Sequence, residues 1–296
     1  MSIPRVLSSF LAAALAGVAL LPAAPRQVHA MRGGTIRIGA VFPLSGSMSP
    51  LARQEYRGIR IAQELVNAAG GIHGRAIVLD TRELDTPAQA RSVMRSLHSA
   101  RITTVLGAYS SALSVPASSA AAHNGMVYWE AGAVADRLTG RGLPTVFRVG
   151  ASGANLGSNS ARFAALQLAP RLSKKTNHMR ISIVFAGDDY AASVAAAAMK
   201  ESEARGMRIV SRTRYDEYMP DWSQVIARVK RAHPDVLILA SHIPDGVSFR
   251  RAMLAAHLHV GAFVGSTMAQ MRSRLRSHAG RRCHRSLRFR SPSRRI

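Results

Sequence analysis

Short apolar runs alternate with helical patterns along almost the whole chain, from Gly34 to Gln270. In the opening unit, the apolar run Ile36–Phe42 has strand length, the polar segment PLSG follows, and a helical pattern then ends at Gly70-Gly71. Further apolar runs lie at 77–82, 103–107, 126–129, 181–185, 208–212, 236–240 and 260–265. Strands that alternate with single helices predict right-handed βαβ units. The predicted fold class is therefore α/β, with parallel sheets flanked by helices.

The alternation is interrupted once, by the segment VGASGANLGSNS, which begins at Val149 and is rich in Gly, Ser and Asn. A loop composition at this point predicts a crossing between two domains. We predict a leader at 1–30, an N-terminal ligand-binding lobe at 31–150, a C-terminal lobe at 151–270 and an arginine-rich tail at 271–296. Two α/β lobes that face each other form a cleft, and such clefts are common small-molecule sites.

The first 30 residues have the three-part layout of a secretory signal peptide. Arg5 is basic, the stretch from Phe10 to Leu21 is apolar, and Val28-His29-Ala30 offers small residues at a cleavage site. The alternative is a membrane span, but a span needs about 20 apolar residues and Pro22 ends this run early. We therefore expect an exported, periplasmic protein without a lipid anchor, since no cysteine lies near the cleavage site.

Much of the formal net charge of +24 comes from the C-terminal tail, which holds ten arginines after Gln270 and no acidic residue. Three interpretations of this tail stay open. It could be a basic arm that binds phosphates. It could be a disordered tail. It could also be the out-of-frame translation of a GC-rich gene, which the abrupt change in composition favours. We predict no nucleic-acid partner.

No motif of an enzyme or of a metal site is evident. The sequence lacks a G-x-S-x-G elbow and a G-x-x-x-x-G-K-[ST] loop. His257 and His259 form an H-x-H pair without an obvious third ligand. The only cysteine, Cys283, excludes a disulfide within the chain. We predict a protein without catalytic activity, cofactor or metal.

Polar and small residues gather just after the predicted strands, where ligands bind in open α/β sheets. The candidate ligand-binding residues are Ser45, Tyr109, Ser110, Ser111, Ala131, Gly132 and Ala133 in the first lobe, and Tyr190, His242 and Asp245 in the second. Ser110 and Ser111 precede a helix, so their hydroxyl and N–H groups could hold a carboxylate. Asp245 could pair with an ammonium group. Taken singly, Ser111 and Asp245 are better explained as helix caps, and only their shared placement favours a ligand site.

Several segments of residues 35–270 resemble the periplasmic binding proteins of branched-chain amino acid ABC transporters, the Leu/Ile/Val-binding class. They are IRIGAVFPLSG with YRGIRIAQELVNAAGGIHGR, ELDTPAQARSVMRSL with VLGAYSSALSVPASSAAAHNGMVYWEAGA, FRVGASGANLGSN, VFAGDDYAAS and LILASHIPDGVSFRRAM. The order and spacing of these segments agree with the family, as does the signal peptide. The resemblance implies a two-lobed type I periplasmic binding fold that closes on a small ligand and docks onto a membrane permease.

The resemblance also implies roles for individual residues. It implies carboxylate contacts at Ser110 and Ser111, ligand contacts at Ala131, Ala133 and Tyr190, and an acidic contact near Asp245. Members of the family carry varied cargo, including amides, urea and aromatic acids, and the sequence EAGA at 130–133 stands where a loop often bears threonine. The expected ligand is therefore a small amino acid, an amide or a urea-like molecule, and not an amino acid alone. The protein is expected to be a monomer.

Family members normally continue for about another hundred residues, so we expect a C-terminally truncated chain with an incomplete second lobe. Two alternatives to a transport protein remain: a ligand sensor of the same fold, or a truncated product without function.

Overall fold

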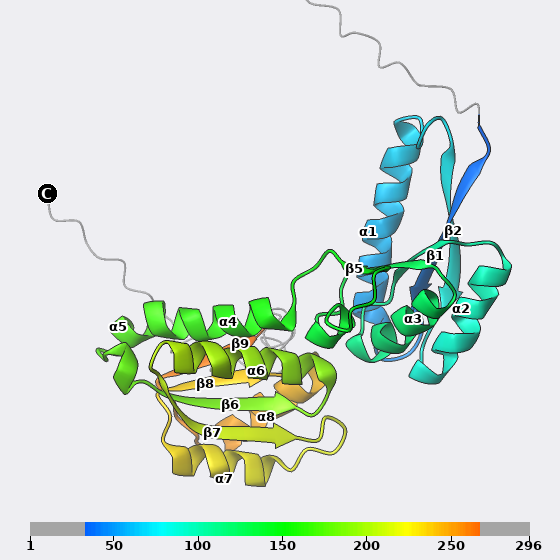
Figure 1. The fold of residues 1–296 in the computed structure, drawn as a ribbon. Helices are drawn as coiled ribbons and strands as arrows, with labels where there is room; N and C mark the ends of the chain where they lie inside the picture. Colours follow the sequence, from blue (N-terminus) through cyan, green and yellow to red (C-terminus); the bar gives the residue numbers. More distant parts are fainter. Residues whose placement is uncertain (1–32, 267–296) are drawn as a thin grey trace, which may run out of the picture.

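The computed structural model describes residues 33–266, which form two parallel sheets flanked by helices (Figure 1). We call residues 35–148, with the five-stranded sheet, the first lobe, and residues 153–266, with the four-stranded sheet, the second lobe. The predicted signal peptide and the arginine-rich tail lie outside the described residues. The prediction of an α/β fold with parallel sheets is confirmed.

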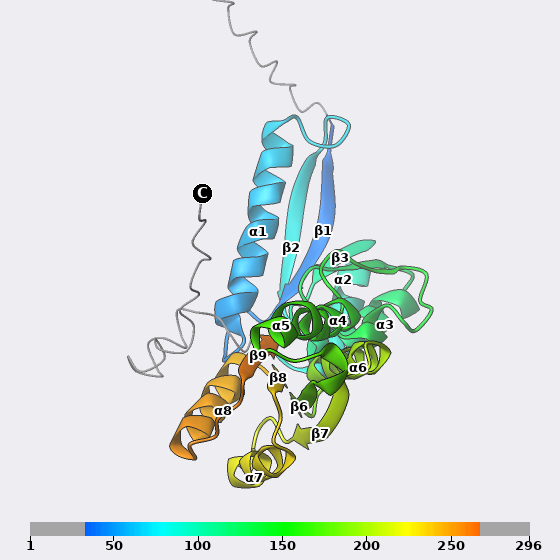
Figure 2. The ribbon, with the colours of Figure 1, turned by 90° about the vertical axis from the view of Figure 1, so that its left-hand side faces the viewer.

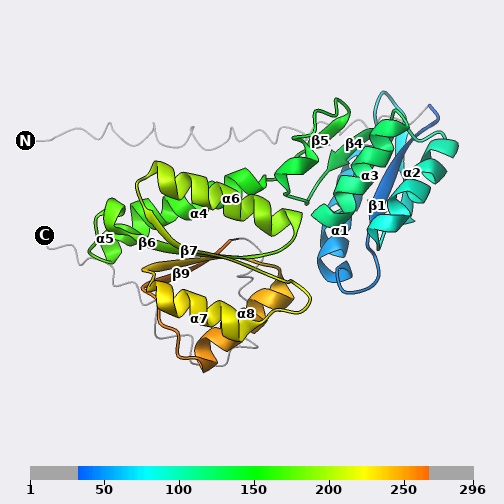
Figure 3. The same ribbon diagram turned by 60° about the horizontal axis from the view of Figure 1, so that its bottom comes forward.

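The first lobe has the strand order β2-β1-β3-β4-β5, and all neighbouring strands are parallel. The strands are β1 (Thr35–Phe42), β2 (Ala76–Glu83), β3 (Thr104–Gly107), β4 (Val127–Glu130) and β5 (Val146–Arg148). The helices are α1 (Ser49–Ala68), α2 (Ala90–Ser99) and α3 (Ser111–His123), with short turns η1 (Pro87–Gln89) and η2 (Asp136–Leu138). Helix α1 covers one face of the sheet, and α2 and α3 pack together on the other face (Figure 3).

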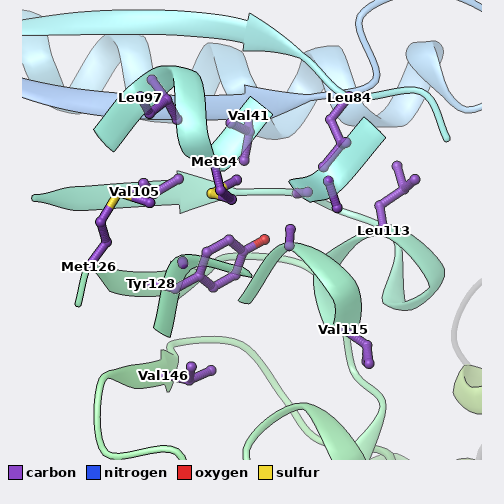
Figure 4. Close-up of a cluster of buried hydrophobic side chains, with 14 of the residues drawn as sticks. Val41, Leu84, Met94, Leu97, Val105, Leu113, Val115, Met126, Tyr128 and Val146 are labelled. Carbon is purple, nitrogen blue, oxygen red and sulfur yellow. The ribbon is translucent and has the colours of Figure 1, made fainter. Parts of the chain in front are cut away.

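The core of the first lobe lies between its sheet and the pair α2 and α3 (Figure 4). Val41 and Val105 come from the strands, Met94 and Leu97 come from α2, and all four side chains are fully buried. The apolar side chains of α2 recur at helical spacing, so burial of this one face holds the helix on the sheet.

The second lobe has the strand order β7-β6-β8-β9, again with parallel neighbours. The strands are β6 (Arg180–Ala186), β7 (Arg208–Tyr215), β8 (Val236–Ala240) and β9 (Ala262–Ser266). The helices are α4 (Gly153–Phe163), α5 (Ala169–Arg171), α6 (Asp189–Ala204), α7 (Trp222–Ala232) and α8 (Ile243–Ala255), with η3 (Ala164–Leu168) and η4 (Thr176–His178). Helices α4 and α6 cover one face and α7 and α8 the other, which explains why every residue of β8 is buried (Figure 3).

Small residues allow α4 and α6 to pack closely. Gly153 and Gly157 of α4 are buried, and a Cβ atom on Gly157 would lie 2.0 Å from the carbonyl oxygen of Val194 in α6. Opposite them, α6 buries Ala191, Val194 and Ala195. The small side chains of the alanine-rich helix α6 therefore allow its backbone to lie close to that of α4.

The chain passes from the first lobe to the second through residues 149–152 (Figure 1). The view of Figure 2 looks along α4, with α1 running beside β1 and β2 of the first lobe. A small set of contacts joins the lobes beside the crossing. The N–H of Gly153 donates to the carbonyl oxygen of Val134 at 2.7 Å. The N–H of Asp136 donates to Oγ of Ser193 at 3.1 Å. Arg137 and Asp189 form an exposed ion pair at 3.1 Å.

The sequence pattern predicts a helix with Pro116 in its first turn and a helix from about 158 to 168, and it predicts no strand at 146–148. The structure differs from all three predictions. Pro116 lies well inside α3 and not in its first turn, because the helix begins at Ser111. The helix expected from about 158 begins at Gly153, where Ser152 caps it by accepting a hydrogen bond from the N–H of Asn155 at 3.0 Å. Strand β5 was not predicted, because its three residues are too few for a periodic pattern.

Candidate functional site

The loops after β3 and β4 form the first-lobe side of the candidate site, and the carboxylate of Glu130 holds them together. This side chain is fully buried at the end of β4. The N–H groups of Ala108, Gly132 and Ala133 donate to it at 2.7–2.9 Å. The N–H of Tyr109 donates to it at 3.3 Å. Burial raises the pKa of Glu130, and these backbone donors act in the opposite direction.

Because Glu130 accepts the N–H groups of Gly132 and Ala133, these two groups are already engaged in the protein itself. The predicted residues Ala131, Gly132 and Ala133 thus form a loop whose shape is set by an internal carboxylate. Ala131 is partly exposed, and its N–H donates to the carbonyl oxygen of Gly107 at 3.3 Å.

A second carboxyl group, that of Glu55 in α1, lies against the same loop. A Cβ atom on Gly132 would lie 2.2 Å from Oε2 of Glu55, so only glycine fits at that position without a shift. Oε1 of Glu55 is buried and has no hydrogen-bond partner among the described residues. Burial, together with the charge of Glu130, raises the pKa of Glu55 to about 8. Glu55 is therefore largely protonated at neutral pH.

The loop between β3 and α3 contains three predicted site residues. Tyr109 has a left-handed backbone with φ of 78°, and Ser110 is the N-cap residue of α3 without a capping bond from its side chain. Ser111 begins the helix, and its Oγ accepts the N–H of Ala135 at 3.2 Å. Burial raises the pKa of Tyr109, and Glu55 and Tyr190 add to this effect. Tyr190 of the second lobe thus acts electrostatically on Tyr109 of the first.

In the second lobe, Tyr190 is buried at the start of α6. Its hydroxyl lies 3.4 Å from the carbonyl oxygen of Ser241 and 3.3 Å from that of Ser266. Its ring packs against the ring of His242, with 4.9 Å between the centroids. The hydroxyl thus points into its own lobe, while the ring fixes the position of the histidine.

His242 is the N-cap residue of α8 and contacts two carboxylates from neighbouring strand ends. Its Nε2 forms an ion-pair contact with Asp188 and lies 3.5 Å from Oε2 of Glu217. Burial acts to lower the pKa of His242, but the hydrogen bond and the charge of Asp188 outweigh it and the pKa is raised. Asp188 also caps α6, because its Oδ1 accepts the N–H of Ala191 at 2.8 Å.

Asp245 lies in the first turn of α8 and is only 6% exposed. The hydroxyl of Tyr215 donates to its Oδ2 at 2.5 Å, while Oδ1 has no hydrogen-bond partner among the described residues. Burial and the charge of Asp245 raise the pKa of Tyr215. The predicted acidic residue is thus a buried carboxylate anchored by a tyrosine.

The structure groups most of the predicted residues and leaves one apart. Ser45 is exposed after β1, where its hydroxyl donates to Asp85 at 3.4 Å, and no contact ties it to the β3 and β4 loops. The sequence interpretation did not include Glu55, Glu130, Asp188 and Glu217. Glu130 and Asp188 directly follow predicted strands, so position alone could have identified them. Glu55 lies on a helix, and no local sequence signal indicates its contact with Gly132.

Among residues 33–266, no helix is both long and apolar enough to span a bilayer. The site residues all lie in loops or first turns at the carboxyl ends of strands, apart from Glu55 in α1. This arrangement provides hydrogen-bond acceptors, hydroxyls and aromatic rings from two lobes, which suits the binding of a small polar molecule.

Comparison with known proteins shows the family of the chain. The sequence matches the family described as Periplasmic binding protein over residues 35–279. A curated relative from Brucella abortus, "Leu/Ile/Val-binding protein homolog 8", is 33% identical over 244 residues, which cover 82% of this chain and 60% of the relative. The chain therefore spans about three fifths of the length of that relative.

Solved structures share the fold at lower sequence identity. An ABC transporter substrate-binding protein from Desulfitobacterium hafniense, solved with Leu, has a TM-score of 0.65 at 21% identity, covering 79% of this chain and 66% of its own. A solute-binding protein from Rhodopseudomonas palustris, solved with 3,4-dihydroxybenzoic acid, has a TM-score of 0.67 at 16% identity. The match covers 80% of this chain and 63% of the other protein.

Proposed function

Since the chain belongs to the periplasmic binding protein family, we propose that it captures a small solute between its two lobes and delivers it to an ABC transporter. The family consists of extracytoplasmic solute-binding proteins. The proposed solute is a small amino acid or an amide-like molecule. The proposed partner is the membrane permease of the transporter, and the proposed location is the periplasm.

The observation that carries this proposal is the placement of polar groups from both lobes around the two tyrosines Tyr109 and Tyr190. Tyr109 follows β3 in the first lobe and Tyr190 lies in the first turn of α6 in the second, and Tyr190 contributes to the raised pKa of Tyr109. Ligands of open α/β sheets bind beyond the carboxyl ends of the strands. A solute at this place would contact both lobes at once.

The charges of the two sides favour a ligand with a hydrogen-bond donor or a cationic group. The second lobe presents the buried carboxylate of Asp245, whose Oδ1 lacks a partner among the described residues. On the first lobe, the N–H groups of Gly132 and Ala133 are taken by Glu130. A ligand carboxylate would therefore depend on Ser110 and the start of α3.

The ligands named for similar proteins suggest which compounds to test. One relative carries the name of a Leu/Ile/Val-binding protein, and one similar structure holds Leu. Another similar structure holds an aromatic acid. Isothermal titration calorimetry of the full chain with leucine, isoleucine, valine, smaller amino acids, amides, urea and hydroxybenzoates would identify the ligand class.

Three variants test the site itself. Ser110→Ala and Asp245→Asn should each weaken binding of the best ligand about tenfold or more, because the first removes a hydroxyl and the second removes a negative charge. Ser96→Ala, an exposed serine inside α2, is the matched control and should leave the affinity unchanged. A cooperatively folded protein that gives no heat with any ligand would contradict the proposal. If Ser96→Ala lost as much affinity as the two site variants, the loss would reflect reduced protein stability and not a lost ligand contact.

A further inference from the structure

The second lobe places one potential metal ligand at the same position after each of three neighbouring strands. β7, β6 and β8 are adjacent and parallel. Asp188 is the second residue after β6, Glu217 the second after β7 and His242 the second after β8. The register aligns these strand ends, since Ala186 pairs with Tyr215. Three side chains that are distant in the sequence therefore meet at one edge of the sheet.

The distances between their donor atoms suit a single metal ion. One ligand atom from each of Asp188, Glu217 and His242 lies within 4.8 Å of the others. Nε2 of His242 lies 3.5 Å from Oε2 of Glu217. Bonds of about 2.0–2.2 Å from zinc to nitrogen and oxygen place two ligands of a tetrahedral site about 3.3–3.6 Å apart. The separation between His242 and Glu217 matches that edge. Oδ2 of Asp188 is hydrogen-bonded to Nε2 of His242, so its carboxylate would rotate away from the ring to admit an ion.

The two carboxylates lack a cationic partner other than the histidine. Among residues 33–266, no lysine or arginine forms an ion pair with Asp188 or Glu217. Their side chains are 19% and 22% exposed, so they are partly removed from water. Two carboxylates that share a partly buried position repel each other. A divalent cation between them would compensate this charge.

The surrounding residues fix the candidate ligands in place. Oδ1 of Asp188 caps α6, which leaves Oδ2 directed to His242. The ring of Tyr190 packs against that of His242. Asp245, three residues after His242, is 6% exposed, and its Oδ1 has no hydrogen-bond partner in the described part of the chain. Its negative charge acts on His242 and adds to the attraction for a cation.

An open hollow lies beside Glu217, one of the three candidate ligands. It has a volume of about 390 Å³ and is lined by Gly187, Arg214, Tyr215, Asp216, Glu217 and Tyr218. Arg214 is the cationic residue of this lining, and its guanidinium donates to the carbonyl oxygen of Gly187 at 2.8 Å. This bond holds the guanidinium at the carbonyl of Gly187.

We propose that Asp188, Glu217 and His242 bind a divalent transition-metal cation of the zinc class. One imidazole and two carboxylates are the donors that zinc, cobalt and nickel accept, whereas calcium and magnesium prefer oxygen ligands alone. The proposed ligands all belong to the second lobe, and His242 is shared with the candidate solute site, so ion binding is tested in the absence of solute.

Equilibrium dialysis of the untagged full chain against Zn²⁺, without any solute, tests the site. We expect one ion per chain at this site, and Co²⁺ should give visible absorption bands typical of a low-coordinate histidine and carboxylate site. Glu217→Gln and His242→Asn should each weaken binding at least tenfold, because each removes one of three ligands. Asp216→Asn and His257→Asn are matched controls, since one changes a neighbouring exposed carboxylate and the other a distant histidine.

The outcomes separate this site from others in the chain. Cys283→Ser should retain the bound ion. Loss of the ion in this variant, or binding that survives both Glu217→Gln and His242→Asn, would overturn the proposal. So would the absence of any Zn²⁺ binding by the wild-type chain. If His242→Asn fails to fold, the Glu217→Gln variant decides, because it leaves the contact between His242 and Asp188 intact.

Discussion

Glu55 and Glu130 share one poorly hydrated region of the first lobe, and the structure gives them different roles. Glu130 accepts hydrogen bonds from the backbone of both site loops, so its negative charge is compensated by N–H groups. Oε1 of Glu55 has no such donor among the described residues, and the charge of Glu130 opposes its ionisation. The protein therefore favours the protonated form of Glu55.

This difference makes stability depend on pH. The pKa of Glu55 is raised from 4.5 to about 8 in the folded protein. The folded state then binds a proton that the unfolded state has lost between these values, so stability falls as pH rises from about 4.5 to about 8. Glu55→Gln cannot ionise. Relative to wild type, it should gain stability on the order of a few kcal/mol between pH 5 and pH 8.

Urea unfolding at pH 5, 6.5 and 8 measures this effect. Glu64→Gln is the control, since Glu64 lies in the same helix with a side chain that is 65% exposed. Its stability should follow that of wild type at all three values. Parallel profiles for Glu55→Gln and wild type would mean that Glu55 is ionised in the folded protein.

At the scale of single residues, the sequence predicted positions better than contacts. Tyr109, Ser110 and Tyr190 were recognised because each follows a strand, and the structure places them there. The bond from Ala135 to Ser111 was not foreseen, because it joins residues 24 positions apart. The contact of Glu55 with Gly132 depends on how α1 packs on the sheet, which no local pattern records.

At the scale of secondary structure, long periodic segments were predicted with near-correct bounds. The helix predicted at 222–232 and the strand predicted at 236–240 have the same bounds as α7 and β8. Asp221 caps the helix, and the strand is a fully apolar run. The start of α4 was placed too late, because its first turn contains Gly153 and Gly157, which disfavour helices. Tertiary packing outweighs the low helix propensity of glycine here, since these two glycines allow α6 to pack closely against α4.

Two glycine substitutions should therefore have opposite effects. Gly157→Ala places a Cβ atom 2.0 Å from the carbonyl oxygen of Val194, so it should destabilise the protein by about 1–3 kcal/mol. Gly58→Ala, in the exposed part of α1, meets no atom within 4 Å and should stabilise by up to about 1 kcal/mol. Chemical denaturation of both variants tests this pair of signs. Stabilisation by Gly157→Ala would show that α4 and α6 can separate at little cost.

At the scale of the whole molecule, each lobe has its own hydrophobic core. The contacts between the lobes are largely polar and include the exposed ion pair of Arg137 with Asp189. Such exposed pairs contribute about 0–1 kcal/mol. Val134 packs at the edge of the second-lobe core, so the lobes are not fully separate. These few contacts contribute little stability compared with the apolar side chains that are buried within each lobe.

We therefore expect the lobes to unfold as two units, and a matched pair of substitutions tests this. Met94→Ala empties a buried position in the first lobe, and Met253→Ala does the same in the second. Each should cost about 2–5 kcal/mol. Hydrogen exchange measured by segment should speed up across 35–148 in the first variant and across 153–266 in the second. Faster exchange throughout the chain in either variant would mean that the interlobe contacts couple the two cores into one cooperative unit.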